Sequence, residues 1–84
     1  MNYTGRLDAL LRTDDFFLII EFKYSEIESL DLMLKKGENQ IIKNGYYKPY
    51  QDKNPFILTI AIKPITVKCV FKSLNDVLKQ YKDS

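Results

Sequence analysis

The chain has 84 residues, of which 45% are hydrophobic and 29% charged, and its formal net charge is +2. These values are typical of one small globular domain spanning residues 1–84, and the charge is too small to indicate nucleic-acid binding by the chain as a whole. With no histidine and a single cysteine, the sequence excludes a histidine-assisted nucleophile, an internal disulfide and a classical zinc site.

The first half of the chain predicts a β-hairpin. Arg6 to Leu11 and Phe16 to Lys23 are rich in β-favouring residues, and Thr13-Asp14-Asp15 between them has the composition of a turn. The second strand is nearly continuous in apolar residues, which predicts that both of its faces are covered. A pairing symmetric about Asp14-Asp15 joins residues whose numbers sum to 29 (14 + 15).

A long helix is expected next, from Ser25 to Tyr47, with Ser25 as its N-cap and Gly37 tolerated inside it. Asn44-Gly45 is expected to end or kink this helix. A second helix follows Ser73, which caps it.

Two further strands are predicted between these helices. Gln51 to Pro55 is polar and indicates a loop, whereas Phe56 to Lys63 and Thr66 to Lys72 are rich in Ile and Val, with Pro64 between them. The resulting order, β-β-α-β-β-α, predicts an α/β domain built on a small mixed β-sheet.

The predicted hairpin register brings charged residues together. Asp8 faces Glu21, Arg6 faces Lys23, and all four side chains project from one face. Because facing carboxylates repel each other, we expect a cation between Asp8 and Glu21, which is either a divalent metal or the side chain of Lys23 or Arg6. In the metal interpretation the ion is Mg²⁺ or Mn²⁺, with the Phe22 carbonyl as a further oxygen ligand. Lys23 would then orient the attacking water or stabilise charge on phosphorus. The alternative is that Glu21 and Lys23 mark an ordinary solvated face.

Several short motifs in the chain resemble those of a known protein family. Gly5-Arg6-Leu7-Asp8, then Ile19 to Lys23, then Gln40-Ile41 followed by Tyr46 and Tyr50, resemble the PD-(D/E)xK nuclease superfamily. The pattern is most similar to the nuclease-like domain at the C-terminus of many bacterial AAA-ATPase-like proteins. The resemblance implies a metal-dependent nuclease that hydrolyses phosphodiester bonds in DNA or RNA.

The same resemblance implies roles for single residues. Asp8 and Glu21 match the two metal-binding acids, Lys23 matches the catalytic lysine, and Gln40 matches a helix glutamine that leans toward the site. Superfamily cores begin with a helix, but only Met1 to Thr4 precede the Gly-Arg motif. We therefore expect a restriction-endonuclease-like core that lacks its N-terminal helix.

Basic and aromatic residues alternate along the long helix and its exit, which is typical of a surface that tracks a phosphate backbone. The alternative is a solvated helix face with packed tyrosines. The candidates for nucleic-acid contact are Arg6, Lys43, Tyr46 and Tyr50, with Lys35, Lys36, Lys48, Lys53 and Tyr47 nearby.

Three functions remain open: an active nuclease, a catalytically inactive nucleic-acid- or protein-binding module with the same fold, and a small structural domain. No apolar run is long enough to span a membrane and no signal peptide is evident, so we expect a cytoplasmic protein. Cys69 alternates with apolar neighbours and is expected to be a buried structural thiol.

The predicted hairpin also indicates self-association. Its apolar face needs cover, and the strand from Arg6 to Leu11 is a possible open edge. We therefore expect a homodimer that pairs edge strands or buries this face.

Overall fold

The structure is a computed structural model that describes residues 8–82. Its elements, in chain order, are β1 (Ala9–Arg12), β2 (Phe17–Tyr24), α1 (Leu30–Lys43), the 3-10 helix η1 (Lys48–Lys53), β3 (Phe56–Lys63), β4 (Thr66–Ser73) and α2 (Leu74–Lys82). This order confirms the predicted β-β-α-β-β-α succession. Arg6 and Leu7, expected at the start of the first strand, lie outside the described residues. So do Met1 to Thr4, on which the expectation of a missing N-terminal helix rested.

The four strands form one mixed sheet in the order β1-β2-β3-β4. β1 runs antiparallel to β2, β2 parallel to β3, and β3 antiparallel to β4. The crossover between the parallel strands contains α1, as parallel pairing requires a long connection. In the first hairpin Ala9 pairs with Ile20 and Leu10 with Ile19, so the predicted register is confirmed.

The start of α1 differs from the prediction. Ser29 is its N-cap, because the Ser29 hydroxyl accepts a hydrogen bond from the Leu32 amide at 3.1 Å. Ser25 instead accepts hydrogen bonds from the amides of Ile27 and Glu28. Its hydroxyl therefore closes a separate turn, and the predicted helix start at Ser25 is wrong. The break expected at Asn44-Gly45 is confirmed, because α1 ends at Lys43 with Asn44 as C-cap, whereas the helix does not continue to Tyr47 as predicted.

Of two other local predictions, the loop from Gln51 is wrong and the Ser73 cap is confirmed. The segment expected as a loop from Gln51 is largely part of η1, which begins at Lys48, with Pro49 in its first turn. The cap on α2 is confirmed, because the Asp76 amide donates to the Ser73 hydroxyl at 3.1 Å.

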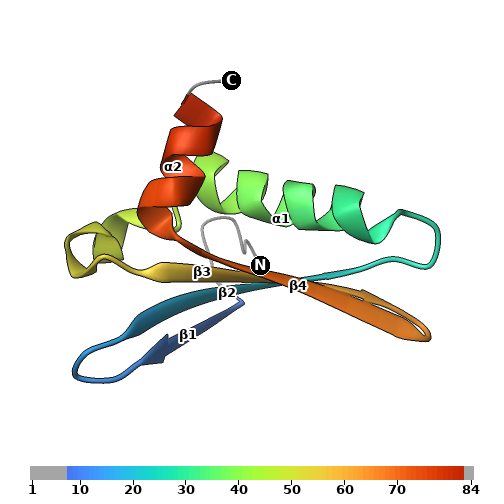
Figure 1. Cartoon of the computed structure of the whole chain (residues 1–84), viewed down its shortest axis with the longest axis horizontal. Helices are drawn as coiled ribbons and strands as arrows, with labels where there is room; N and C mark the ends of the chain where they lie inside the picture. The colour runs from blue at the N-terminus through green and yellow to red at the C-terminus, as the bar shows by residue number, and fades with distance from the viewer. Residues whose placement is uncertain (1–7, 83–84) are drawn as a thin grey trace, which may run out of the picture.

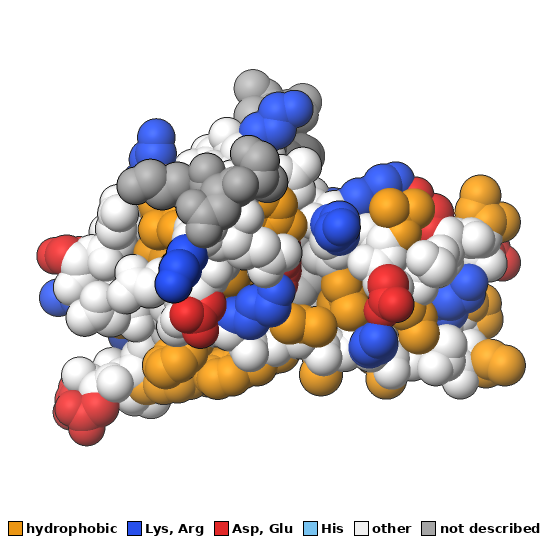
Figure 2. All heavy atoms as spheres, turned by 45° about the horizontal axis from the view of Figure 1, so that its top comes forward, with side chains coloured by type: hydrophobic (Ala, Val, Ile, Leu, Met, Phe, Trp, Pro, Cys, Tyr) orange, Lys and Arg blue, Asp and Glu red, His pale blue; other side chains and the backbone are white. Residues whose placement is uncertain are grey.

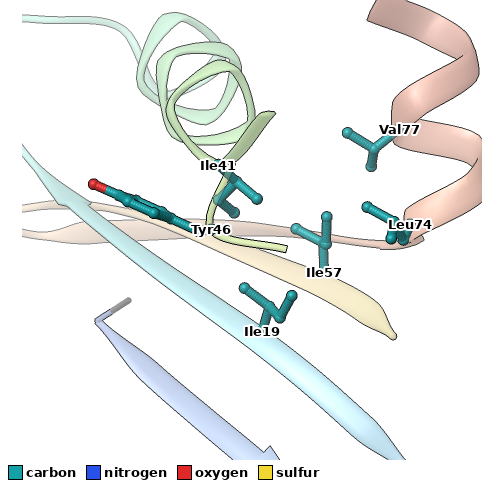
Figure 3. Packing of buried hydrophobic residues seen from close by; sticks show 6 residues of the cluster. All are labelled: Ile19, Ile41, Tyr46, Ile57, Leu74 and Val77. Atoms are coloured by element: carbon teal, nitrogen blue, oxygen red, sulfur yellow. The ribbon is translucent and has the colours of Figure 1, made fainter. Parts of the chain in front are cut away.

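Both helices lie on the same side of the sheet (Figure 1). One core cluster joins β2, β3, the segment after α1 and both helices. Its six buried members, shown in Figure 3, are Ile19, Ile41, Tyr46, Ile57, Leu74 and Val77. The Tyr46 hydroxyl points away from the other five side chains. A second cluster joins the first half of α1, through Met33 and Leu34, to Ala61 of β3. The core is therefore one layer of side chains between the sheet and the helices.

The opposite face of the sheet has no helix over it in the described part of the chain. Phe22 is 45% exposed and Tyr24 is 63% exposed on that face, so the prediction that β2 is covered on both sides is wrong. Cys69 on β4 is also exposed, which corrects the expectation of a buried thiol. Neither helix between residues 8 and 82 has the length and apolar character needed to span a membrane.

Candidate metal and active site

Strand β2 presents its charged residues to the helices. Glu21 and Lys23 are two residues apart and share the helix side with the core residue Ile19. Glu21 is only 3% exposed. Asp8 directly precedes β1, and its Oδ2 atom accepts a hydrogen bond from the Phe22 amide at 2.8 Å. The hairpin register therefore brings the two predicted acids side by side.

This proximity changes the acidity of Glu21. Burial of the carboxyl group, followed by the negative charge of Asp8, raises the pKa of Glu21 to about 7. The Lys23 ammonium acts in the opposite direction from 3.6 Å away, where it forms an ion pair with Glu21. The pair of acids thus needs either a proton or a cation to be stable near neutral pH.

Helix α1 reaches the site through Gln40. The Lys23 ammonium donates a hydrogen bond to Gln40 Oε1. On its other side, Gln40 Nε2 lies 3.5 Å from the Tyr46 hydroxyl, which also accepts from Asn44 Nδ2 at 3.1 Å. This chain of contacts holds the Lys23 side chain between Glu21 and α1.

Gly37 and Thr59 lie next to Glu21, and neither was predicted as a site residue. A Cβ atom at Gly37 would lie 2.6 Å from Thr59 Cγ2 and within 3.5 Å of the side chains of Glu21 and Lys23. Gly37 therefore lets α1 approach the site closely. Thr59 pairs with Glu21 across the parallel strands. Its Oγ1 is buried and has no hydrogen-bond partner among the described residues. The only sequence feature that pointed to this close contact was a glycine in the middle of the predicted helix.

The oxygen atoms at this site fit a magnesium ion with a small protein ligand set. The described residues hold no cluster of three or more His, Cys, Asp or Glu side chains, so a metal ion at this site would have only the carboxylates of Asp8 and Glu21. In an antiparallel ladder one residue directs its N–H and C=O toward the same neighbour. The Phe22 carbonyl is therefore on the side where its amide meets Asp8. Mg²⁺ is commonly held by one or two carboxylates, with water and substrate phosphate completing the shell.

The described candidates for nucleic-acid contact differ in their exposure. Arg6 lies outside the described residues. Lys43 is exposed at the end of α1. Tyr46 is 5% exposed, so its ring packs in the core and has no free face for a base. Tyr50 is half-buried, with its ring 5.5 Å from that of Phe17.

Other lysines on this side are engaged in ion pairs. Lys36 contacts Glu28, and Lys72 contacts Glu38 at 3.0 Å. Glu38 is 4% exposed, and no pattern in the sequence predicted its burial. These pairs tie α1 to its preceding turn and to β4, which agrees with a structural role for part of the basic surface.

The comparison with protein families adds an independent observation. The profile of the PD-(D/E)XK nuclease superfamily matches residues 1–74, which is most of the chain and includes Asp8, Glu21, Lys23 and Gln40. The chain belongs to the PD-(D/E)XK nuclease superfamily. Searches of curated proteins and of solved structures found no match.

Membership agrees with the architecture. A four-stranded mixed sheet with helices, in which a parallel strand pair is bridged by α1, is a restriction-endonuclease-like α/β fold. Within this PD-(D/E)XK chain, Glu21-Phe22-Lys23 has the acid-x-lysine spacing that gives the superfamily its name.

Proposed function

We propose that the chain is a Mg²⁺- or Mn²⁺-dependent nuclease domain that hydrolyses phosphodiester bonds in DNA or RNA. The observation that carries the proposal is the convergence of Asp8, the buried Glu21 and Lys23 at one point of the sheet. The superfamily match supports this reading of the cluster. The resemblance to the C-terminal domains of AAA-ATPase-like proteins further suggests that such a domain works beside an ATPase domain.

Each residue has a distinct part in this proposal. Asp8 uses Oδ2 for the Phe22 amide, which leaves Oδ1 for a metal ion, and Glu21 and the Phe22 carbonyl supply the other protein oxygens. When bound, Mg²⁺ would polarise the phosphodiester and activate a water molecule. Lys23 would orient the attacking water or stabilise the charge that develops on phosphorus. Gln40 positions Lys23 through the hydrogen bond between their side chains.

A second candidate is an inactive binding module with the same fold. It is motivated by the pKa of about 7 at Glu21, because a proton competes with a divalent ion for this carboxyl near neutral pH. The two candidates differ in one measurable property, which is the affinity for a divalent ion above pH 7.

Cleavage of labelled single-stranded DNA, duplex DNA and RNA tests the proposal. We expect products with millimolar Mg²⁺ or Mn²⁺ and none with EDTA. Asp8→Asn and Lys23→Met are each expected to lower the rate by at least about 100-fold. The matched controls Glu26→Gln and Lys79→Met change exposed residues and should retain the wild-type rate.

The outcomes separate the candidates. Cleavage that persists in both Asp8→Asn and Lys23→Met would show that the activity comes from another site or from a contaminant. No cleavage of any substrate, together with no binding of a divalent ion above pH 7, would favour the inactive binding module.

A further inference from the structure

The side of the sheet that faces away from α1 and α2 is apolar across its full width. The strand register places Phe22, Ile60 and Cys69 in one row and Ile20, Leu58 and Phe71 in the next. We call this surface the open face, defined as the side chains of β1 to β4 that point to the same side as Phe22. In the described residues it contains no Asp, Glu, Lys or Arg. Charged side chains are instead spread over the helix-bearing side (Figure 2).

Much of the open face is in contact with water. Leu11 is 50% exposed, Phe22 45%, Tyr24 63%, Val67 62% and Phe71 54%. At 150 to 250 Å² for a large side chain, these five residues expose roughly 500 Å² of mainly apolar surface. The half-buried neighbours bring the total toward the roughly 800 Å² that each partner contributes to a standard specific interface. An apolar patch of this size marks an interaction surface.

We propose that a second copy of the chain covers the open face, so that two sheets pack face to face in a two-fold dimer. Two apolar sheet faces pack about 10 Å apart with interdigitated side chains. The described open face carries no charge, so two copies related by a two-fold axis would bury each other's apolar area without bringing like charges together. The net charge of +2 per chain opposes the approach of two copies only weakly.

This dimer leaves the candidate active site accessible. Glu21 and Lys23 point to the helix side, while Phe22 between them points to the open face. The proposed interface and the proposed chemistry therefore occupy opposite faces of β2, and each proposal can fail without the other.

Sedimentation equilibrium at micromolar concentration tests the interface. Wild type is expected at twice the chain mass of 9.9 kDa. Tyr24→Lys and Val67→Lys place a charge on the open face and are expected to raise the dissociation constant at least about tenfold. The control Ile27→Lys changes a residue that is 91% exposed and lies in the turn before α1, and it should remain dimeric.

The reactivity of Cys69 gives a second readout. The thiol is exposed in the single chain, so a thiol reagent should modify it slowly in the wild-type dimer and quickly in Val67→Lys. A folded wild-type monomer, or a dimer that both lysine variants leave intact, would overturn the proposal. Association only with an added partner would also overturn it.

Discussion

At the scale of single residues, the buried carboxyl of Glu21 determines what the site can do. Asp8 and Glu21 are adjacent, and burial together with the charge of Asp8 raises the pKa of Glu21 to about 7. Stability is lost when this carboxyl ionises, because burial and Asp8 oppose its charge more than Lys23 favours it. A metal ion between the two acids, as proposed, would offset this loss.

Glu21→Gln is expected to stabilise the metal-free protein at alkaline pH. The pKa of Glu21 is 4.5 when unperturbed and about 7 in the folded protein, so the folded state binds the extra proton between these values. Stability should therefore fall as the pH rises through this range, by on the order of 3 kcal/mol, and remain low above it. Urea unfolding at pH 5 and pH 8, with EDTA, measures this difference.

Glu26→Gln is the matched control, because Glu26 is exposed, and it should keep the wild-type pH dependence. If wild type and Glu21→Gln lose the same stability between pH 5 and pH 8, Glu21 is not the group that titrates.

Gln40→Ala tests whether Gln40 positions Lys23. Without the amide that accepts from its ammonium, Lys23 should sample several rotamers, and the cleavage rate should fall about tenfold while metal affinity stays unchanged. Asn39→Ala changes the exposed neighbour on the same helix and should behave as wild type. Equal losses of rate and metal affinity in Gln40→Ala would indicate a general disturbance of the site.

At the scale of elements, the close approach of α1 to the sheet depends on Gly37. The nearest atom to a Cβ at this position is Thr59 Cγ2, which belongs to a β-branched side chain with few alternative rotamers. The helix therefore has to move away from β3 when position 37 gains a side chain. Such a movement also changes the distance between Gln40 and Lys23.

Gly37→Ala is expected to destabilise the protein by roughly 1 to 3 kcal/mol, although alanine favours a helix by about 1 kcal/mol relative to glycine. Asn39→Ala also raises the helix propensity of α1, but it places no new atom against Thr59. Thermal or urea unfolding of the two variants measures the difference. A Gly37→Ala protein more stable than wild type would show that α1 has room to move.

The sequence predicts some elements well for identifiable reasons. The hairpin register follows from Asp14-Asp15 at the centre of a symmetric turn, and it places Asp8 opposite Glu21. The start of α1 is not predictable in the same way, because Ser25 and Ser29 both suit an N-cap and only packing selects Ser29. The tight contact at Gly37 needs the position of β3, which local patterns do not contain.

At the scale of the whole molecule, the structure has one helix layer on one sheet face (Figure 1). The apolar run in β2 suggested two covered faces, but such a run shows only that both sets of side chains are apolar. Whether a face is covered depends on elements distant in sequence. The exposure of Cys69 and Phe22 follows from this layering and was not visible in the strand patterns.

If the open face is a dimer interface, thermal stability should depend on protein concentration. Mass action stabilises the folded dimer relative to unfolded chains, so the wild-type Tm is expected to rise as the concentration increases. For Val67→Lys the Tm should be lower and nearly independent of concentration. Scanning calorimetry over a wide concentration range provides the comparison, and a constant wild-type Tm would contradict dimeric unfolding.

Calorimetric titration of Mn²⁺ into the protein above pH 7 measures whether Asp8 and Glu21 hold a divalent metal ion, as we propose. We expect one ion to bind per chain, with an affinity that weakens as the pH falls below about 7 because a proton competes with the ion for Glu21. Asp8→Asn should lose binding and Glu26→Gln should retain it. No binding by wild type at millimolar Mn²⁺, or equal binding by Asp8→Asn, would show that these two acids do not form a metal site.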